Sequence, residues 1–415
     1  MEIFKKLCSI MLVVLVILLP VGVSADEFEA QEVMDKIVTE YHSVDLTDPP
    51  VGIIETVGPI GSALDIPAKS CILMEVNTGQ ILYENESHLK LPPASITKVM
   101  ALLLVVEALE SGQLTLETML SASEHACSMG GSQIWLEPNE QMSVDDLMKA
   151  AVIGSANDAT VVLGEALAGS EEGFVAMMNE RAAQLEMKDT VFINSTGLDA
   201  DGHVTSAHDI AVMSKELIKH DIIKNYSTVW MDSLRNGESE LVNTNKLVRF
   251  YEGCTGLKTG TTSQAGACLS ATAERDGLEL VAVVMGAANS NDRFQGARKL
   301  LDYGFANWSY VTVAADKENF KNVKVVGGVE EFVKPTSVVE RSFLIEKGKV
   351  KTLYLETEFE ESLKAPVSLG QQIGITRVYV DGVEIGTVKI TAESAVPKVT
   401  FWYNFKNLLK RLIYV

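Results

Sequence analysis

Basic residues are scarce in this chain. The sequence has 35 Lys and Arg against 56 Asp and Glu, which gives a formal net charge of −21 at pH 7. So acidic a surface repels phosphate backbones, and no basic run offsets it between the two ends of the chain. The composition therefore predicts that nucleic acid is not a partner.

Proline is also scarce, with 11 residues in 415, whereas 47% of the residues are hydrophobic. This composition excludes a fibrous chain and a largely disordered one, and it is typical of a globular protein with real cores. At roughly 100 to 200 residues per domain, the length predicts two or three folding units.

The cysteines and histidines lack the spacings that bind metal ions. The sequence contains no Cys-x-x-Cys, no zinc-type Cys/His spacing and no His-Glu-x-x-His. The one local group, His203 and His208 among three aspartates, is interpreted as a polar loop and a helix cap. The sequence predicts neither a metal site nor a cofactor.

Four cysteines lie beyond the first 25 residues and could pair in three ways in an oxidising compartment. Two of them, Cys71 and Cys268, lie in apolar, strand-like runs. A free buried thiol is the commoner state in such surroundings, so we expect buried free thiols.

The chain begins like a secretory signal peptide. Lys5 and Lys6 form a basic start, residues 10–19 are apolar, and Val23-Ser24-Ala25 is a small-residue cleavage site. The apolar run is short for a membrane-spanning anchor, which is the alternative interpretation. We therefore expect residues 1–25 to be removed and the remainder to be exported.

The next segments differ in character. Residues 26–61 combine an acidic, helix-like stretch with a linker punctuated by proline and glycine. From residue 62 the patterns predict a hairpin over 71–83 and a helix over 95–110. Further helices are expected over 144–153, 159–168, 173–185 and 292–308, and neighbouring strands over 267–273 and 278–285. Residues 62–308 are thus predicted to form a mixed α/β domain with a largely antiparallel sheet.

Beyond residue 308 the helix signals stop and short alternating runs follow, over 323–326, 350–355, 375–380 and 383–390. Asp381-Gly382 between the last two is a strong hairpin turn. Residues 309–393 are predicted to be a small all-β sandwich domain. Its expected role is structural, to hold the first domain off a membrane surface.

The last segment, residues 394–415, contains an amphipathic pattern from Phe401 onward. Phe401, Phe405 and Leu412 belong to the apolar face, whereas Asn404 and Lys410 belong to the polar face. The segment is too short to span a bilayer, and a basic amphipathic helix with aromatic residues suits the plane of an anionic membrane surface. The alternative is a helix docked on its own protein.

Three short motifs carry the candidate chemistry: Ser95-Ile96-Thr97-Lys98, Ser155-Ala156-Asn157 and Lys258-Thr259-Gly260. Ser95 and Lys98 share one helix face across a single turn. A serine hydroxyl needs an adjacent base to become a nucleophile, and a lysine can be that base only when its amine is neutral. Apolar surroundings and a second cation, Lys258, both lower a lysine pKa.

Each motif alone is weak. Ser-x-x-Lys also occurs at Ser87-His88-Leu89-Lys90, which is interpreted as solvated surface. Ser155-Ala156-Asn157 could be a capping turn, and Lys258 could merely protect an exposed edge strand from aggregation.

Together, and in this order, the three motifs resemble those of class A β-lactamases and penicillin-binding proteins. The resemblance covers about residues 62–309 and is closest to the low-molecular-weight penicillin-binding proteins of the D-alanyl-D-alanine carboxypeptidase family. Residues 92–98 and 192–198, the added β domain and the amphipathic tail all resemble that family. A β-lactamase/transpeptidase-like fold is therefore expected.

The resemblance implies roles for three residues in catalysis. Ser95 would attack the penultimate D-alanine carbonyl of a peptidoglycan muropeptide and release the terminal D-alanine, leaving an acyl-enzyme. Lys98 would act as the base, and Ser155 would relay a proton to the leaving amine. β-Lactam antibiotics would acylate the same serine as covalent inhibitors.

It also implies a substrate-binding set. Asn157 would hold the substrate backbone, and Lys258 would face the terminal carboxylate with the hydroxyls of Thr259 and Thr261. Gly260 completes this strand. The backbone amides of Ser95 and Thr261 would form the oxyanion hole. The enzyme would work at the outer face of the cytoplasmic membrane, attached through its C-terminal helix.

Three alternatives remain open at this point. A class A β-lactamase would resemble Glu-x-x-Leu-Asn between the second and third motifs, but here the nearest stretch, residues 238–243, is out of register. A transpeptidase would use the same acyl-enzyme and need an amine acceptor. A catalytically idle, membrane-tethered protein would bind peptidoglycan without turnover, and covalent labelling by a penicillin would exclude it.

Overall fold

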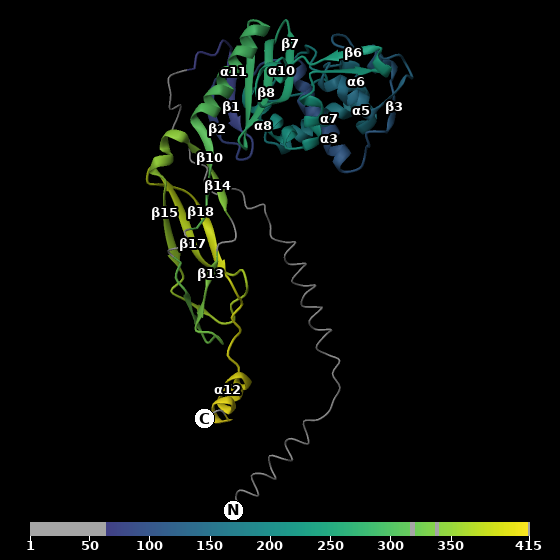
Figure 1. Ribbon diagram of the computed structural model, residues 1–415. Coiled ribbons are helices and arrows are strands. Elements are labelled where there is room, and N and C mark those ends of the chain that lie inside the picture. Colours follow the sequence, from purple (N-terminus) through teal and green to yellow (C-terminus); the bar gives the residue numbers. More distant parts are fainter. Residues whose placement is uncertain (1–63, 316–319, 337–339, 414–415) are drawn as a thin grey trace, which may run out of the picture. The chain divides into compact units, whose positions relative to one another are not determined.

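The computed structural model describes residues 64–315, 320–336 and 340–413 (Figure 1). The signal peptide predicted over residues 1–25 and the helix and linker predicted over residues 26–61 lie outside these ranges. Within them, no helix is long and apolar enough to cross a membrane. The described residues form a mixed domain, an all-β domain and a C-terminal helix.

A five-stranded sheet forms the middle of the mixed domain. Its strand order is β2-β1-β9-β8-β7, and every neighbouring pair is antiparallel. The hairpin predicted over 71–83 and the strands predicted over 267–273 and 278–285 are confirmed. The strands are β1 (Ser70–Glu75), β2 (Ile81–Asn85), β7 (Cys254–Thr262), β8 (Gly266–Arg275) and β9 (Leu278–Ala287).

Both faces of this sheet are covered, which explains why its central strands are nearly continuous apolar runs. Alternate residues of a strand point to opposite faces. In β1, Ile72 and Met74 belong to the core shared with a layer of helices, whereas Cys71 and Leu73 belong to the core under α11 (Ser290–Asn307). Figure 1 shows α11 along the sheet.

The helical layer is built around α3 (Lys98–Glu110), which is buried on almost every side, as a core helix should be. Ser143, Ser170 and Ser206 each accept a backbone N–H bond in the first turn of the next helix. The longer helices are α5 (Val144–Val152), α6 (Asn157–Ala168), α7 (Glu171–Gln184) and α8 (Ala207–Ile218). Shorter elements are β3 (Met119–Ser121), α4 (Glu124–Cys127), β4 (Gln141–Ser143), α9 (Asp221–Ser227), β5 (Met231–Leu234), η2 (Arg235–Gly237), β6 (Ser239–Val242) and α10 (Leu247–Phe250).

The helices predicted over 144–153, 159–168, 173–185 and 292–308 are confirmed to within a few residues. The helix predicted over 95–110 is confirmed only from Lys98 on. Its first turn is a separate 3-10 turn, η1 (Ala94–Thr97). The chain turns sharply at Ala94, where φ is 50°, and the tighter hydrogen bonds of a 3-10 turn accommodate this start.

The all-β domain contains three small sheets whose buried residues share one core. Val325, Phe343, Val378 and Ile390 come from different strands and belong to that core. The sheet orders are β10-β14, β12-β11-β16 and β13-β18-β17-β15. The strands are β10 (Trp308–Val313), β11 (Val323–Val326), β12 (Phe332–Val333), β13 (Pro335–Thr336), β14 (Arg341–Glu346), β15 (Tyr354–Phe359), β16 (Ser362–Lys364), β17 (Gln372–Val380) and β18 (Val383–Ala392).

Sequence patterns predicted this domain unevenly. The hairpin at Asp381-Gly382 is confirmed, with φ of 51° and 78° at the two turn residues. The strand predicted over 350–355 is largely wrong, because η4 (Lys347–Thr352) occupies its first half and β15 begins at Tyr354. β14 was not predicted, because three consecutive buried residues interrupt the alternation on which the predictions relied.

The C-terminal helix is α12 (Phe401–Ile413). Residues before it still pair with the β domain, since Val396 bridges Val367 and Lys398 bridges Gly328. Several large apolar side chains of α12 are exposed: Phe401, Trp402, Phe405, Leu408 and Leu412.

The prediction of buried free thiols is confirmed for Cys71 and Cys268 and only in part for Cys127 and Cys254. Cys71 and Cys268 are buried and free, and Cys127 and Cys254 are half-buried and also free. Burial raises the pKa of the Cys71 thiol to about 11, so this group stays protonated and unreactive at neutral pH.

Candidate active site

The first candidate pair lies where η1 joins α3. Ser95 is half-buried in η1, and Lys98, the first residue of α3, is completely buried. The Lys98 Nζ lies 3.1 Å from the Ser95 Oγ. The sequence-predicted nucleophile and base are therefore within hydrogen-bonding distance.

Two other oxygens hold the same amine. Lys98 Nζ donates to Asn157 Oδ1 at 2.5 Å and to the Thr196 carbonyl at 2.8 Å. Burial lowers the pKa of Lys98 well below its usual value, and Lys258 lowers it further, while Asp158 opposes the shift. A neutral amine has two hydrogens and one lone pair. With both hydrogens directed at Asn157 and Thr196, the lone pair is left for the Ser95 hydroxyl.

Asn157 and Asp158 begin α6 and organise a loop over residues 130–136. The Asn157 side chain donates to the Gly130 carbonyl at 2.6 Å, and its backbone N–H donates to the Ser132 carbonyl at 2.7 Å. The buried Asp158 carboxylate accepts backbone N–H bonds from Ile134 and Leu136. Asn157 is thereby locked between this loop and Lys98.

Ser155 lies in the turn between α5 and α6. It is 4% exposed, and its φ of 62° places it in the left-handed region that non-glycine residues rarely adopt. Such strain persists only where the surrounding structure imposes it. In the described part of the chain, no hydrogen bond joins the Ser155 hydroxyl to another site residue. The structure therefore buries Ser155 near the start of α6 without connecting it to Ser95 or Lys258.

Lys258, Thr259, Gly260 and Thr261 lie on β7, an edge strand of the sheet. Lys258 is 1% exposed, so it does not protect that edge from solvent as the alternative interpretation required. Burial lowers its pKa to about 7, with a further contribution from Arg293. Lys258 can therefore gain or lose its charge near neutral pH.

Gly260 lets this strand approach the nucleophile. A Cβ atom at Gly260 would lie 2.9 Å from the Ala94 Cβ and 3.0 Å from the Ser95 backbone nitrogen. A Cβ at Gly197 would lie 1.8 Å from the Ala94 carbonyl oxygen. Two glycines on separate segments thus pack against the turn at Ala94, and no side chain fits at either position.

Arg293 on α11 was not identified from the sequence. Its guanidinium donates to the Gly260 carbonyl at 2.9 Å and to the Thr261 Oγ1 at 2.8 Å. The other strand hydroxyl, Thr259 Oγ1, donates to Thr244 Oγ1 at 2.8 Å. Neither Arg293 nor Thr244 lies in a recognisable motif, so no sequence signal pointed to them.

His203 contacts η1, the turn that carries Ser95, through Thr97. It is 3% exposed, and its Nε2 lies 2.9 Å from the Thr97 Oγ1, while its Nδ1 accepts the Ile193 N–H. Burial lowers its pKa to about 4, so the imidazole is neutral at physiological pH. The predicted cap is confirmed, since Ser206 caps α8, but His203 is a buried partner of Thr97 rather than part of a polar loop.

Among the residues that the structure describes, no group of three or more His, Cys, Asp or Glu side chains could hold a metal ion. The reactive groups gathered here are a serine hydroxyl, a buried amine and a second amine that titrates near neutral pH. Such a set suits acyl transfer to serine.

Comparisons with known proteins agree with this chemistry. Residues 58–289 match the D-alanyl-D-alanine carboxypeptidase family, and residues 308–398 match the C-terminal domain of penicillin-binding protein 5. The carboxypeptidase DacF of Bacillus subtilis is 38% identical over 360 residues, which cover 86% of this chain and 92% of DacF.

Solved structures extend the match to the fold. Penicillin-binding protein 5 of Haemophilus influenzae has a TM-score of 0.69 and 30% identity, over 81% of this chain and all of that one. Penicillin-binding protein D2 of Listeria monocytogenes, solved in its ampicillin-bound form, has a TM-score of 0.54 and 31% identity over 59% of this chain and all of that one. Because both domains match and the similarity to DacF runs through most of both chains, this protein belongs to the D-alanyl-D-alanine carboxypeptidase family of low-molecular-weight penicillin-binding proteins.

Proposed function

We propose that this protein is a serine-type D-Ala-D-Ala carboxypeptidase that removes the terminal D-alanine from peptidoglycan stem pentapeptides. The observation that carries this proposal is the buried Lys98 amine, held by two carbonyl-type oxygens and lying 3.1 Å from the Ser95 Oγ. Burial favours the neutral amine, which is the form that can accept the serine proton.

In the acylation step, the Ser95 oxygen attacks the carbonyl carbon of the penultimate D-alanine and its proton passes to Lys98. An ester to Ser95 forms and the peptide C–N bond breaks. The proton on Lys98 passes to the departing D-alanine nitrogen, by a relay that we assign to Ser155, and this leaves Lys98 neutral again. Water then attacks the ester, with Lys98 as the base, and restores the Ser95 hydroxyl.

The negative charge that develops on the carbonyl oxygen needs hydrogen-bond donors. We assign this role to the backbone N–H groups of Ser95 and Thr261. The close packing of Gly260 against the Ser95 nitrogen supports the assignment, because it places β7 directly beside the nucleophile turn. Loss of one such donor typically lowers kcat by about 100-fold or more.

Recognition of the substrate's terminal carboxylate falls to β7 in this proposal. Lys258 supplies the positive charge, and the hydroxyls of Thr259 and Thr261 supply hydrogen bonds. Arg293 holds the same strand through its hydrogen bonds to the Gly260 carbonyl and the Thr261 Oγ1. Asn157, whose side-chain amide already bonds the Gly130 carbonyl and Lys98, is assigned to the substrate backbone.

The test is product analysis with the purified protein and a pentapeptide ending in D-Ala-D-Ala. We expect release of one D-alanine per peptide and covalent labelling by a fluorescent penicillin, and we expect Ser95→Ala to lose both. Ser87→Ala, in the second Ser-x-x-Lys, is the control and should keep both. A penicillin adduct without D-alanine release would instead indicate a transpeptidase, and retained labelling in Ser95→Ala would place the nucleophile elsewhere.

We further propose that the protein is exported and attached to the outer face of the cytoplasmic membrane through α12. The signal-peptide pattern of residues 1–25 and the exposed aromatic side chains of α12, including Phe401 and Trp402, support this proposal. In co-sedimentation with anionic vesicles, Phe405→Glu should weaken binding. Asn404→Glu introduces the same charge on the polar face and should weaken it less. Equal losses would argue against burial of the Phe405 face in the lipid.

A further inference from the structure

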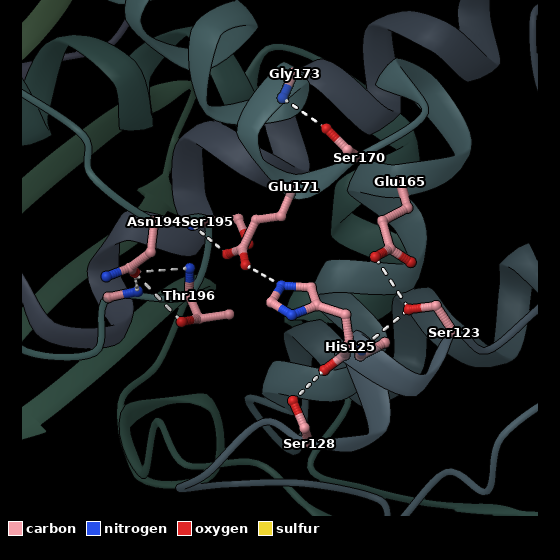
Figure 2. Close-up of polar contacts among 12 residues, drawn as sticks. Ser123, His125, Ser128, Glu165, Ser170, Glu171, Gly173, Asn194, Ser195 and Thr196 are labelled. Atoms are coloured by element: carbon pink, nitrogen blue, oxygen red, sulfur yellow. Dashed lines mark hydrogen bonds and ion pairs between the residues drawn. The ribbon is translucent and has the colours of Figure 1, made fainter.

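A carboxylate outside the catalytic motifs connects two segments that hold the active site. Glu171 lies in the first turn of α7, and its side chain is 13% exposed. It accepts hydrogen bonds from the Ser195 backbone N–H at 3.0 Å and the Ser195 hydroxyl at 2.7 Å, and its other oxygen lies 2.6 Å from His125 Nε2. Figure 2 shows Glu171 between His125 and Ser195. We call these three residues the His125–Glu171–Ser195 bridge.

One end of the bridge leads to the catalytic lysine. Asn194 Oδ1 accepts the backbone N–H groups of Thr196 and Gly197, which makes a tight turn out of residues 194–197. The carbonyl of Thr196 in this turn accepts the hydrogen bond from Lys98 Nζ. Ser195 is fully buried, and Glu171 is the hydrogen-bond partner of its hydroxyl. Displacement of Glu171 would therefore disturb Ser195, which is the residue next to Thr196, whose carbonyl accepts the hydrogen bond from Lys98.

The other end leads to the substrate-binding asparagine. His125 lies in α4, and the chain continues directly from α4 to Gly130, whose carbonyl accepts the Asn157 side-chain amide. α4 is also tied to α6, because the Ser123 hydroxyl donates to Glu165 Oε1 at 3.0 Å. The bridge thus joins the segment that carries the Gly130 carbonyl to the segment that carries the Thr196 carbonyl.

The groups that face His125 all favour its protonated form. They are Glu171 and Glu172 of α7 and Glu165 of α6. The pKa of His125 is raised, chiefly by its hydrogen bond to Glu171, although burial opposes the shift. For Glu171, burial alone would raise the pKa, but the bonds from Ser195 and His125 outweigh it and lower the value.

We propose that the His125–Glu171–Ser195 bridge positions the Thr196 and Gly130 carbonyls against Lys98 and Asn157, and that the bridge is tightest when His125 is protonated. Glu171 and His125 are then positioning residues rather than catalytic ones. Because the raised folded-state pKa belongs to a histidine, the extra stabilisation is present at low pH and is lost as the pH rises through that pKa. A neutral imidazole still hydrogen-bonds Glu171 but no longer pairs with its charge.

This inference rests on the proposed roles of Lys98 and Asn157, and its signature is a pH-dependent ratio. The rate of acylation by a penicillin is measured for the parent, His125→Gln and Glu171→Gln from about pH 6 to about pH 9. The parent and the variants share the titrations of Lys98 and Lys258. Division of each variant's rate by the parent's rate at the same pH therefore cancels the effect of these titrations on the rate. We expect His125→Gln to be about fivefold slower at low pH, the size of a modest ion pair, and to converge with the parent at high pH. Glu171→Gln also alters the bonds to Ser195, which do not depend on pH, so it should stay slower than the parent at every pH.

His220→Gln is the matched control. His220 also pairs with a carboxylate, Glu110 Oε2 at 2.8 Å. Glu110 ends α3, at the opposite end of that helix from Lys98, and neither partner lies in the segments that carry the Gly130 and Thr196 carbonyls. Its ratio to the parent should stay near one at every pH. A ratio for His125→Gln that does not change with pH, or the same change in His220→Gln, would overturn the inference.

Hydrogen exchange of the Ser195 amide gives a readout that needs no catalysis. After correction for intrinsic exchange, His125→Gln should exchange faster than the parent at low pH and equally fast at high pH. If the protein released no D-alanine but showed this pattern, the proposed function would fail while the bridge stood. Unchanged Ser195 exchange in His125→Gln would overturn the bridge, whatever the activity.

Discussion

The chain contains the pattern Ser-x-x-Lys twice, and the two copies have opposite surroundings. In Ser95-Ile96-Thr97-Lys98, the lysine is completely buried and its Nζ meets the serine hydroxyl. In Ser87-His88-Leu89-Lys90, the lysine side chain is 55% exposed and lies 3.6 Å from Asp189. The spacing is identical, so the surroundings alone distinguish a candidate base from a surface cation.

The serines differ as well. Ser87 is 5% exposed and donates to Glu84 Oε2 at 2.6 Å, away from Lys90. The prediction of solvated surface is therefore confirmed for Lys90 and wrong for Ser87. Burial of the serine is not what matters, since the more buried of the two hydroxyls is the one without a base. The two copies differ in the burial of the lysine, which lowers the pKa of Lys98 and so favours the neutral amine that the proposed base requires.

Removal of each lysine in turn tests the difference between Lys98 and Lys90. Lys98→Met should lower the rate of penicillin acylation by about 100- to 10,000-fold, the usual contribution of a positioned base. Lys90→Met should change it less than about twofold, because a surface ion pair is worth little. Stopped-flow acylation measures both, with thermal unfolding to confirm that each variant is folded. Similar losses of acylation rate in the two variants would contradict the distinction between the buried Lys98 and the exposed Lys90.

The next largest effect concerns the approach of β7 to the nucleophile turn. Gly260→Ala would place a methyl group 2.9 Å from the Ala94 Cβ, so the strand and η1 must separate. A misplacement of about 1 Å near reacting groups lowers rates by about 100-fold, and we expect a loss of that order in kcat/KM.

Gly348→Ala is the matched control for Gly260→Ala, since a Cβ at Gly348 would meet no atom within 4 Å. It should leave kcat/KM for the D-Ala-D-Ala peptide unchanged. Normal activity in Gly260→Ala would show that the close contact with Ala94 is not needed to align Ser95.

The motifs made much of this site predictable from the sequence. The pairing of Ser95 with Lys98 follows from helix spacing, whereas the close approach at Gly260 emerged only from the structure. Asn157 was assigned to the substrate, but the structure shows that its side chain also holds Lys98. The fold was predictable for similar reasons, because hydrophobic periodicity and turn residues mark most helices and strands of the mixed domain.

What could not be predicted depends on contacts between distant segments. The Thr196 carbonyl that holds Lys98 is a backbone atom, so its identity as threonine carries no signal. Arg293 reaches Gly260 from a helix that follows two further strands. Ser155 has a left-handed φ in the turn between α5 and α6, a conformation that serine itself does not favour and that its identity does not signal. Each of these features is set by tertiary packing, which local patterns do not encode.

A third lysine, Lys258, is as buried as Lys98 but must carry charge to bind a carboxylate. Its pKa of about 7 means that the protonated, binding form is lost as the pH rises through that value. On the alkaline side, kcat/KM for a D-Ala-D-Ala peptide should therefore fall by up to about tenfold per pH unit, because kcat/KM reports ionisations of the free enzyme. A bound carboxylate holds the Lys258 proton, so the corresponding fall in kcat should lie at higher pH.

Lys258→Arg separates this fall in kcat/KM from any other titration, since a guanidinium stays protonated throughout the accessible range. The fall near pH 7 should disappear in this variant, whereas Lys90→Met should keep it unchanged. A fall that persisted in Lys258→Arg would assign the titration to another group. Loss of the fall would show that two equally buried lysines of one site work in opposite charge states, Lys98 because burial and Lys258 outweigh Asp158, and Lys258 because the substrate brings a carboxylate.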